Sequence, residues 1–88
     1  MAEYYDNETL YDNPQCKKLK KVTIGKNVKT IKAKAFATSK KLKTVIIKGK
    51  ALKKVAKNAF NKKVRKSVKI KGKKKVKNVV LKSLKRKK

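Results

Sequence analysis

Histidine is absent from the chain of 88 residues, and its four acidic side chains all lie between residues 3 and 12. Residues 17–88 therefore contain neither imidazole nor carboxylate side chains. A general acid/base pair, a histidine-based triad and a histidine or carboxylate metal site all need such groups, so none is expected there. We expect a protein that is not an enzyme and that uses no cofactor and no metal.

Cysteine and long apolar runs are also scarce. The single cysteine, Cys16, has no partner for an internal disulfide, and we interpret it as a small buried apolar residue. No run of about 18 apolar residues occurs, so no transmembrane helix is expected. Met1 is followed by an acidic, tyrosine-containing stretch, which lacks the positive and apolar regions of a secretory signal.

The charge is divided sharply along the chain. Residues 1–16 carry four acids and no base, whereas residues 17–88 carry all 31 lysines and arginines, for a formal net charge of +27. High charge with only 6% aromatic residues is a composition typical of disordered segments. The apolar residues argue against disorder, because they recur at a fixed spacing.

The apolar residues of the basic part repeat every 23 or 24 positions. Leu19, Val22 and Ile24 return 23 residues later, and the apolar positions that follow them return after 24. A period in the twenties is typical of a solenoid in which each coil is one supersecondary unit. The equivalent positions are Leu19/Leu42, Val22/Val45/Val68, Ile24/Ile47/Ile70, Val28/Leu52/Val76, Ile31/Val55/Val79, Ala35/Ala59/Ser83 and Phe36/Phe60/Leu84.

The first side of each predicted coil is a short strand. β-branched residues alternate with other residues there, as in a half-buried strand. Equivalent strands stack in parallel, about 4.8 Å apart. The three strands are expected at residues 21–24, 44–47 and 67–70.

The other two sides close the coil. The second side is expected to be a short extended or turn segment, at residues 28–31, 52–55 and 76–79. The third side is expected to be a helix-like turn with one large ring pointing inward, at residues 34–36 and 58–60. Phe36 and Phe60 should then stack in consecutive coils, with Leu84 closing the column.

The pattern resembles the BspA-like leucine-rich repeat. The resemblance runs through Leu-x-x-Val-x-Ile at residues 19–24, Val-x-x-Ile at 28–31, Ala35-Phe36 and Ser39-x-x-Leu42. Cys16-x-x-Leu19 matches the step one unit earlier. The resemblance implies a right-handed solenoid, β-rich α/β in class, with short parallel strands, short helical turns and about three repeats. It also implies a surface-exposed or secreted bacterial protein that adheres to other molecules.

The repeats divide the chain into three expected parts. Residues 1–15 are interpreted as an acidic, tyrosine-containing lead and the remnant of a preceding repeat, disordered before Tyr11 and partly docked near it. Residues 16–84 form the solenoid, whose last unit is degraded as at a solenoid end. Residues 85–88 form a basic tail. We interpret the whole as the C-terminal end of a longer array.

Stacking the coils should arrange the exposed lysines in ladders. Lysine outnumbers arginine 29 to 2, which favours attraction by point charges over bidentate recognition. A solvated face that only keeps the array soluble is the alternative interpretation. The candidate polyanion-contacting residues are Lys20, Lys43 and Lys66 in one ladder, Lys29, Lys53 and Lys77 in a second, and Lys69 on the outer strand face.

These features predict a non-enzymatic binding or scaffold module of a bacterial cell-surface protein, acting in adhesion or polyanion binding. The expected partner is a host or cell-envelope macromolecule: a protein, a glycan or another polyanion. The alternative is an intracellular basic protein that binds nucleic acid without sequence specificity. Self-association through the open ends of a short solenoid is also expected, because about three coils are near the minimum for stability.

Overall fold

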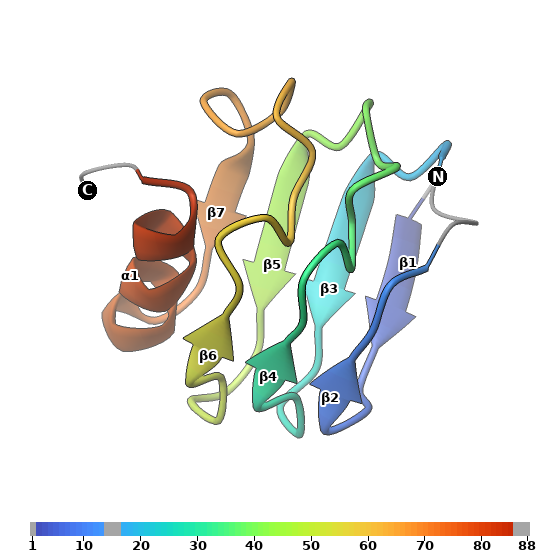
Figure 1. Cartoon of the computed structure of the whole chain (residues 1–88). Helices are drawn as coiled ribbons and strands as arrows, with labels where there is room; N and C mark the ends of the chain where they lie inside the picture. The colour runs from blue at the N-terminus through green and yellow to red at the C-terminus, as the bar shows by residue number, and fades with distance from the viewer. Residues whose placement is uncertain (1, 14–16, 86–88) are drawn as a thin grey trace.

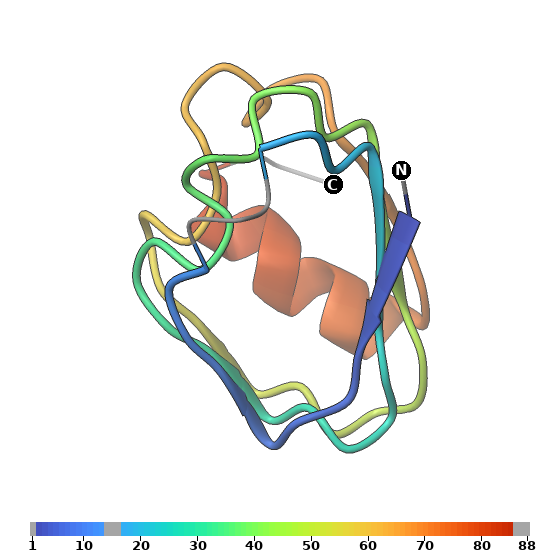
Figure 2. The same cartoon turned by 90° about the vertical axis from the view of Figure 1, so that its right-hand side faces the viewer.

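The chain forms a short stack of coils, in which successive turns of the backbone lie on one another. The computed structural model describes residues 2–13 and 17–85. Figure 2 looks along the stack: the coils superimpose in outline, and a helix crosses the far end. The architecture is a repeat solenoid with parallel strands, as the sequence predicts.

Two parallel sheets make up two sides of the stack (Figure 1). The larger sheet has the strand order β1-β3-β5-β7, and the smaller sheet has the order β2-β4-β6. The strands of the larger sheet are β1 (Ala2–Tyr5), β3 (Lys21–Ile24), β5 (Thr44–Ile47) and β7 (Lys69–Lys71). The smaller sheet holds β2 (Thr9–Leu10), β4 (Thr30–Ile31) and β6 (Lys54–Val55), and helix α1 (Lys74–Ser83) follows β7.

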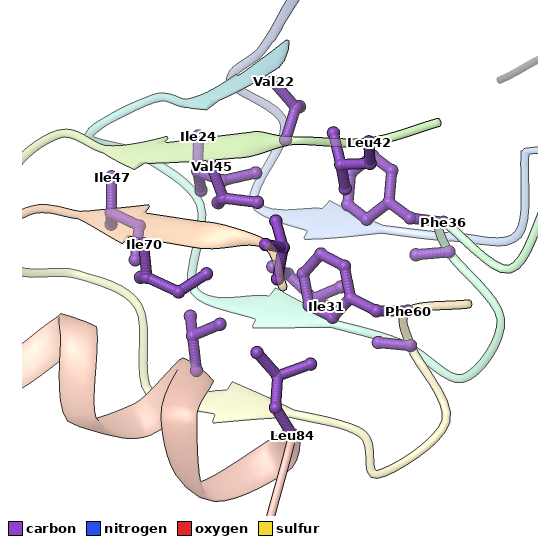
Figure 3. Close-up of a cluster of buried hydrophobic side chains, with 14 of the residues drawn as sticks. Val22, Ile24, Ile31, Phe36, Leu42, Val45, Ile47, Phe60, Ile70 and Leu84 are labelled. Carbon is purple, nitrogen blue, oxygen red and sulfur yellow. The ribbon is translucent and has the colours of Figure 1, made fainter. Parts of the chain in front are cut away.

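The register between β3 and β5 confirms the repeat of 23 residues. Lys21 pairs with Thr44, and Val22 pairs with Val45. In both strands alternate residues are buried, so the β-branched side chains at those positions point into the stack (Figure 3). Between β4 and β6 the step is 24 residues, because Ile31 pairs with Val55.

The register between β5 and β7 differs from the prediction by two residues. Val45 pairs with Ile70, whereas the repeat predicts Val68. Residues 62–67 form consecutive turns, and the amides of Ser67 and Val68 both donate to the carbonyl of Val64, at 3.1 and 2.9 Å. The strand therefore begins at Lys69. A slip of two residues keeps the same side chains facing inward, so both Val68 and Ile70 are buried.

The second side of the last coil is a helix, so the prediction of an extended segment at residues 76–79 is wrong. Val76, Val80 and Leu84 are buried at helical spacing, whereas Val79 is only half-buried. A helix satisfies most of its backbone hydrogen bonds internally, whereas a strand at this position would need a neighbour on its outer side. Helix α1 packs against β6 and β7 and covers this end of the core (Figure 1).

An aromatic column runs through the interior, as predicted. The rings of Phe36 and Phe60 are stacked, with centroids 5.4 Å apart and planes inclined by 18°. Leu84 is buried and lies beyond Phe60 toward the helical end (Figure 3). Tyr5 extends the column at the other end, because its ring meets Phe36 edge-on at 5.8 Å. The segments around the two phenylalanines are hydrogen-bonded turns.

The first coil is ordered, so the expected disorder before Tyr11 is wrong. All four residues of β1 pair in register with β3, and Leu10 of β2 pairs with Ile31. Besides this backbone pairing, the acidic segment is held by the buried side chain of Leu10 and by the ring of Tyr5 packed against the core. The division at residues 15 and 84 stays a prediction, and Cys16 lies outside the described residues.

Asp6 links the turns that follow β1 and β3 on the first two coils. Its carboxylate accepts hydrogen bonds from the backbone amide and the side-chain amide of Asn27, at 2.9 and 2.7 Å. The amide of Gly25 donates to the carbonyl of Tyr5 at 2.7 Å. A Cβ atom at position 25 would collide with the Asp6 side chain, so any larger residue here would force that side chain to move.

Candidate polyanion-binding surface

The solenoid places its lysines outward because the apolar residues between them are needed for the core. All seven candidate lysines are exposed. The carboxylates of the chain lie on the first coil, between residues 3 and 12, so the later coils carry lysines with no acidic side chain among them. The surface of these coils is therefore strongly positive, and it attracts anions over a Debye length of about 8–10 Å.

The structure brings Lys20 and Lys43 together on adjacent coils. The amide of Lys43 donates to the carbonyl of Lys20 at 2.8 Å, so the two residues are neighbours just before β3 and β5. Lys66 does not continue this ladder, contrary to the prediction. It lies in the turns before β7, and it is the amide of Lys69 that donates to the Lys43 carbonyl, at 2.8 Å.

Lys29 and Lys53 form the second pair. The amide of Lys53 donates to the carbonyl of Lys29 at 2.9 Å, and the amide of Lys29 donates to the carbonyl of Glu8 at 2.8 Å. The Lys29 ammonium and the Glu8 carboxylate are 3.8 Å apart, and both side chains are more than half exposed, so this ion pair contributes little to stability. Lys77 lies on α1, so its predicted place in this ladder is wrong.

Lys69 lies on the outer face of the larger sheet, two residues along β5 from the expected position opposite Ile46. It pairs with Thr44, and Lys71 occupies the position opposite Ile46. The slip in register that moves Lys69 also places it beside Lys43. Together with Thr44 and Ser67, these two lysines line a shallow hollow on the sheet.

A second cluster of lysines lies between β6 and α1, and the sequence did not reveal it. Lys54, Lys57 and Lys82 line a groove there together with Lys53. The cluster depends on α1 being helical, because Lys82 reaches it only from the helix. The spacing of the buried Val76, Val80 and Leu84 was the signal that would have predicted this helix.

The described part of the chain offers little other chemistry. Residues 2–13 and 17–85 contain no group of three histidine, cysteine or acidic side chains that could hold a metal ion. No helix in the same residues has the length and hydrophobicity needed to cross a membrane. A hollow of about 250 Å³ lies at the first coil, beside Tyr5, Leu10 and Phe36.

Comparison with known proteins agrees with the repeated geometry. No curated protein and no solved structure matches the chain. The family model described as BspA type leucine-rich repeat region (6 copies) matches residues 8–85. This match covers α1, the stacked Phe36 and Phe60, and every strand of the two sheets except β1, which holds Tyr5. The chain therefore belongs to the BspA-type leucine-rich repeat family, whose repeats form binding or scaffold modules.

Proposed function

We propose that this chain is a non-enzymatic binding module of a bacterial cell-surface protein, and that its lysine array binds polyanions of the cell envelope or of a host. Family membership supports the setting, because proteins of the family are generally found at bacterial cell surfaces. Adhesion follows if the polyanion belongs to another cell. The lysine array supports the ligand class.

The pairing of lysines on adjacent coils carries the proposal. Lys20 neighbours Lys43, and Lys29 neighbours Lys53, each through a backbone hydrogen bond between coils. Parallel neighbours are about 4.8 Å apart, so their ammonium groups repel one another. An anionic polymer lying across the coils relieves this repulsion and releases its own counterions, which makes affinity fall as salt rises.

Recognition by this surface depends on charge spacing more than on a particular sequence or sugar. Lysine provides point charges, and 29 of the 31 basic residues are lysine. Stacking on bases is not available to Phe36 and Phe60, since both rings are buried. The exposed Tyr4 and Tyr11 lie on the acidic first coil. Nucleic acid therefore belongs among the polyanions to be tested and is not favoured as the specific partner.

The test compares polyanions across a salt series. Polyphosphate, a sulfated polysaccharide and duplex DNA are titrated into the protein by calorimetry or fluorescence at several salt concentrations. We expect binding of all three, with log K falling linearly against log salt. Absence of binding to every polyanion at low salt contradicts the proposal, and clearly tighter binding of DNA than of the other two polyanions at equal salt favours the nucleic-acid alternative.

Matched variants distinguish the contribution of paired lysines to binding from that of unpaired lysines. Lys20→Gln/Lys43→Gln removes a neighbouring pair, and Lys66→Gln/Lys77→Gln removes two exposed lysines that the structure keeps apart. We expect the first variant to lose more affinity and to reduce the salt slope by about two on DNA, because each lost phosphate contact reduces it by about 0.9. Equal losses would mean that net charge alone determines binding.

Self-association through the ends of the stack stays a prediction. Strands β1 and β2 lie at the edges of their sheets among the described residues, and an exposed edge favours pairing with another strand. The net charge of +27 opposes it. Sedimentation at low and moderate salt tests whether edge pairing outweighs charge repulsion. We expect a dimer only at moderate salt, where the charges are screened.

A further inference from the structure

The groove between β6 and α1 differs from the rest of the lysine surface because it has an apolar floor. Its volume is about 350 Å³. Val55 of β6 and Val79 of α1 form the floor, and both are half-buried. Lys53, Lys54, Lys57 and Lys82 surround it, and all four are exposed.

The floor is open because the last coil ends in a helix. Ile31 occupies the position equivalent to Val55 in the preceding coil and is fully buried. The element next to β6 on its outer side is α1 (Figure 1), and Val55 of β6 is only half-buried there. The hydroxyl of Ser83 donates to the carbonyl of Ala56 at 2.6 Å, which holds the end of the helix beside the groove.

The four ammonium groups around the floor have no acidic neighbour within the smaller sheet. Every acidic side chain of the sequence lies between residues 3 and 12, and β2, which is in that segment, is at the opposite edge of the sheet from β6. Two strand spacings, about 10 Å, separate these edges, which is more than the Debye length of about 8 Å in physiological salt. The groove therefore favours a small anion with more than one negative charge over a neutral molecule or a monoanion.

We propose that the groove between β6 and α1 binds a phosphate monoester with a short aliphatic chain. A phosphate monoester carries a charge of about −1.5 to −2 at neutral pH and offers three strong acceptor oxygens, which suit several ammonium donors. The aliphatic chain lies on Val55 and Val79. This site goes beyond the polyanion surface, because it uses an apolar floor beside the lysines, which the Lys20/Lys43 pair does not have.

The experiment follows amide chemical shifts during titration with three probes: n-hexyl phosphate, inorganic phosphate and n-hexanol. We expect hexyl phosphate to bind most tightly, with shifts concentrated at Val55, Lys57 and Val79. Each added methylene should increase affinity by up to about fourfold, which is the gain from burying one such group. Equal affinity for hexyl phosphate and inorganic phosphate would overturn the proposal, since the floor would then play no part.

Two variants test the walls and the floor separately. Lys57→Gln/Lys82→Gln should weaken hexyl phosphate binding at least tenfold, whereas Lys20→Gln/Lys43→Gln removes the same charge on another side and should weaken it less than twofold. Val79→Ala keeps a good helix former and should reduce the dependence on chain length while leaving inorganic phosphate unaffected. Equal losses in the two lysine variants would show that only net charge acts, and would overturn the site.

The outcomes also distinguish this site from the polyanion surface. Lys20→Gln/Lys43→Gln tests the paired lysines and leaves the groove intact. Loss of polyanion binding in that variant with normal hexyl phosphate binding supports both proposals. Tight polyanion binding by the unmodified chain together with no shifts on adding hexyl phosphate supports only the first. All replaced lysines are exposed, so the variants are expected to fold, and circular dichroism checks this.

Discussion

Phe60 lies on Phe36 one coil further along the chain, with ring centroids 5.4 Å apart and the two backbones joined by a parallel bridge. Both rings are almost completely buried. The pair links the side of the coil that has least regular structure, so the aromatic column holds together segments that the two sheets do not reach.

Phe60→Ala is therefore expected to lower the free energy of unfolding by about 3–5 kcal/mol, through lost burial and the cavity left behind. The free energy of unfolding of the whole chain is expected to be about 4–13 kcal/mol, so the variant should lose a large fraction of it. Urea denaturation followed by circular dichroism measures this. Tyr4→Ala is the control, because Tyr4 is exposed and its loss should change stability by about 0.5 kcal/mol at most. Similar losses in both variants would contradict the column.

Salt should stabilise the fold. Neighbouring lysines on adjacent coils repel one another, and screening reduces this cost. The melting temperature is expected to rise between low and moderate sodium chloride, and to rise further with polyphosphate if the polyanion binds the folded state. A melting temperature that is flat or falls over the same range would contradict this. Lys20→Gln/Lys43→Gln should show a smaller salt effect.

Asp6 and Gly25 should be energetically coupled. Asp6→Ala removes two hydrogen bonds to Asn27 and is expected to cost about 1–2 kcal/mol. Gly25→Ala forces the Asp6 side chain to move and is expected to lose the same hydrogen bonds. The double variant should therefore cost less than the sum of the two single variants, by at least about 0.5 kcal/mol. If the two losses in free energy of unfolding simply add, then alanine at position 25 is accommodated without moving the Asp6 side chain. Asp12→Ala, at an exposed acid, controls for charge.

Ser83 should hold the end of α1. Its hydroxyl donates to the carbonyl of Ala56 at 2.6 Å, and the side chain is buried. Ser83→Ala leaves that carbonyl without this donor and is expected to lower the free energy of unfolding by about 1–2 kcal/mol. Ser67→Ala, on an exposed turn residue, is the control. Hydrogen exchange should show faster opening of α1 in the first variant only. Equal hydrogen-exchange rates of α1 in the two variants would show that Ser83 does not anchor the helix.

The regular part of the fold was predictable because alternating β-branched residues and a fixed period determine strands and their stacking. Val22, Val45 and the two phenylalanines lie where the repeat places them. The slip between β5 and β7 was not predictable from the pattern, since a shift of two residues buries the same face. Helix α1 was missed because Val76 and Val79 fit the spacing of the repeat as well as a helical one.

The first coil and the groove between β6 and α1 could not be predicted from apolar side-chain patterns. Strand β1 has no apolar pattern of its own, and its place depends on backbone pairing with β3. The candidate lysines were identified as ladders, of which the structure keeps Lys20 with Lys43 and Lys29 with Lys53. The groove beside Val55 required the position of α1, which side-chain periodicity alone left undetermined.

Helix α1 also affects how such an array changes length during evolution. It lies across the interior at one end of the stack, where another coil would have to pack (Figure 2). A duplicated unit placed directly after Ser83 would meet the lysine-covered side of this helix and find no apolar surface to join. We therefore expect new units to be inserted ahead of β7, and the unit that contains α1 to diverge in sequence from the others.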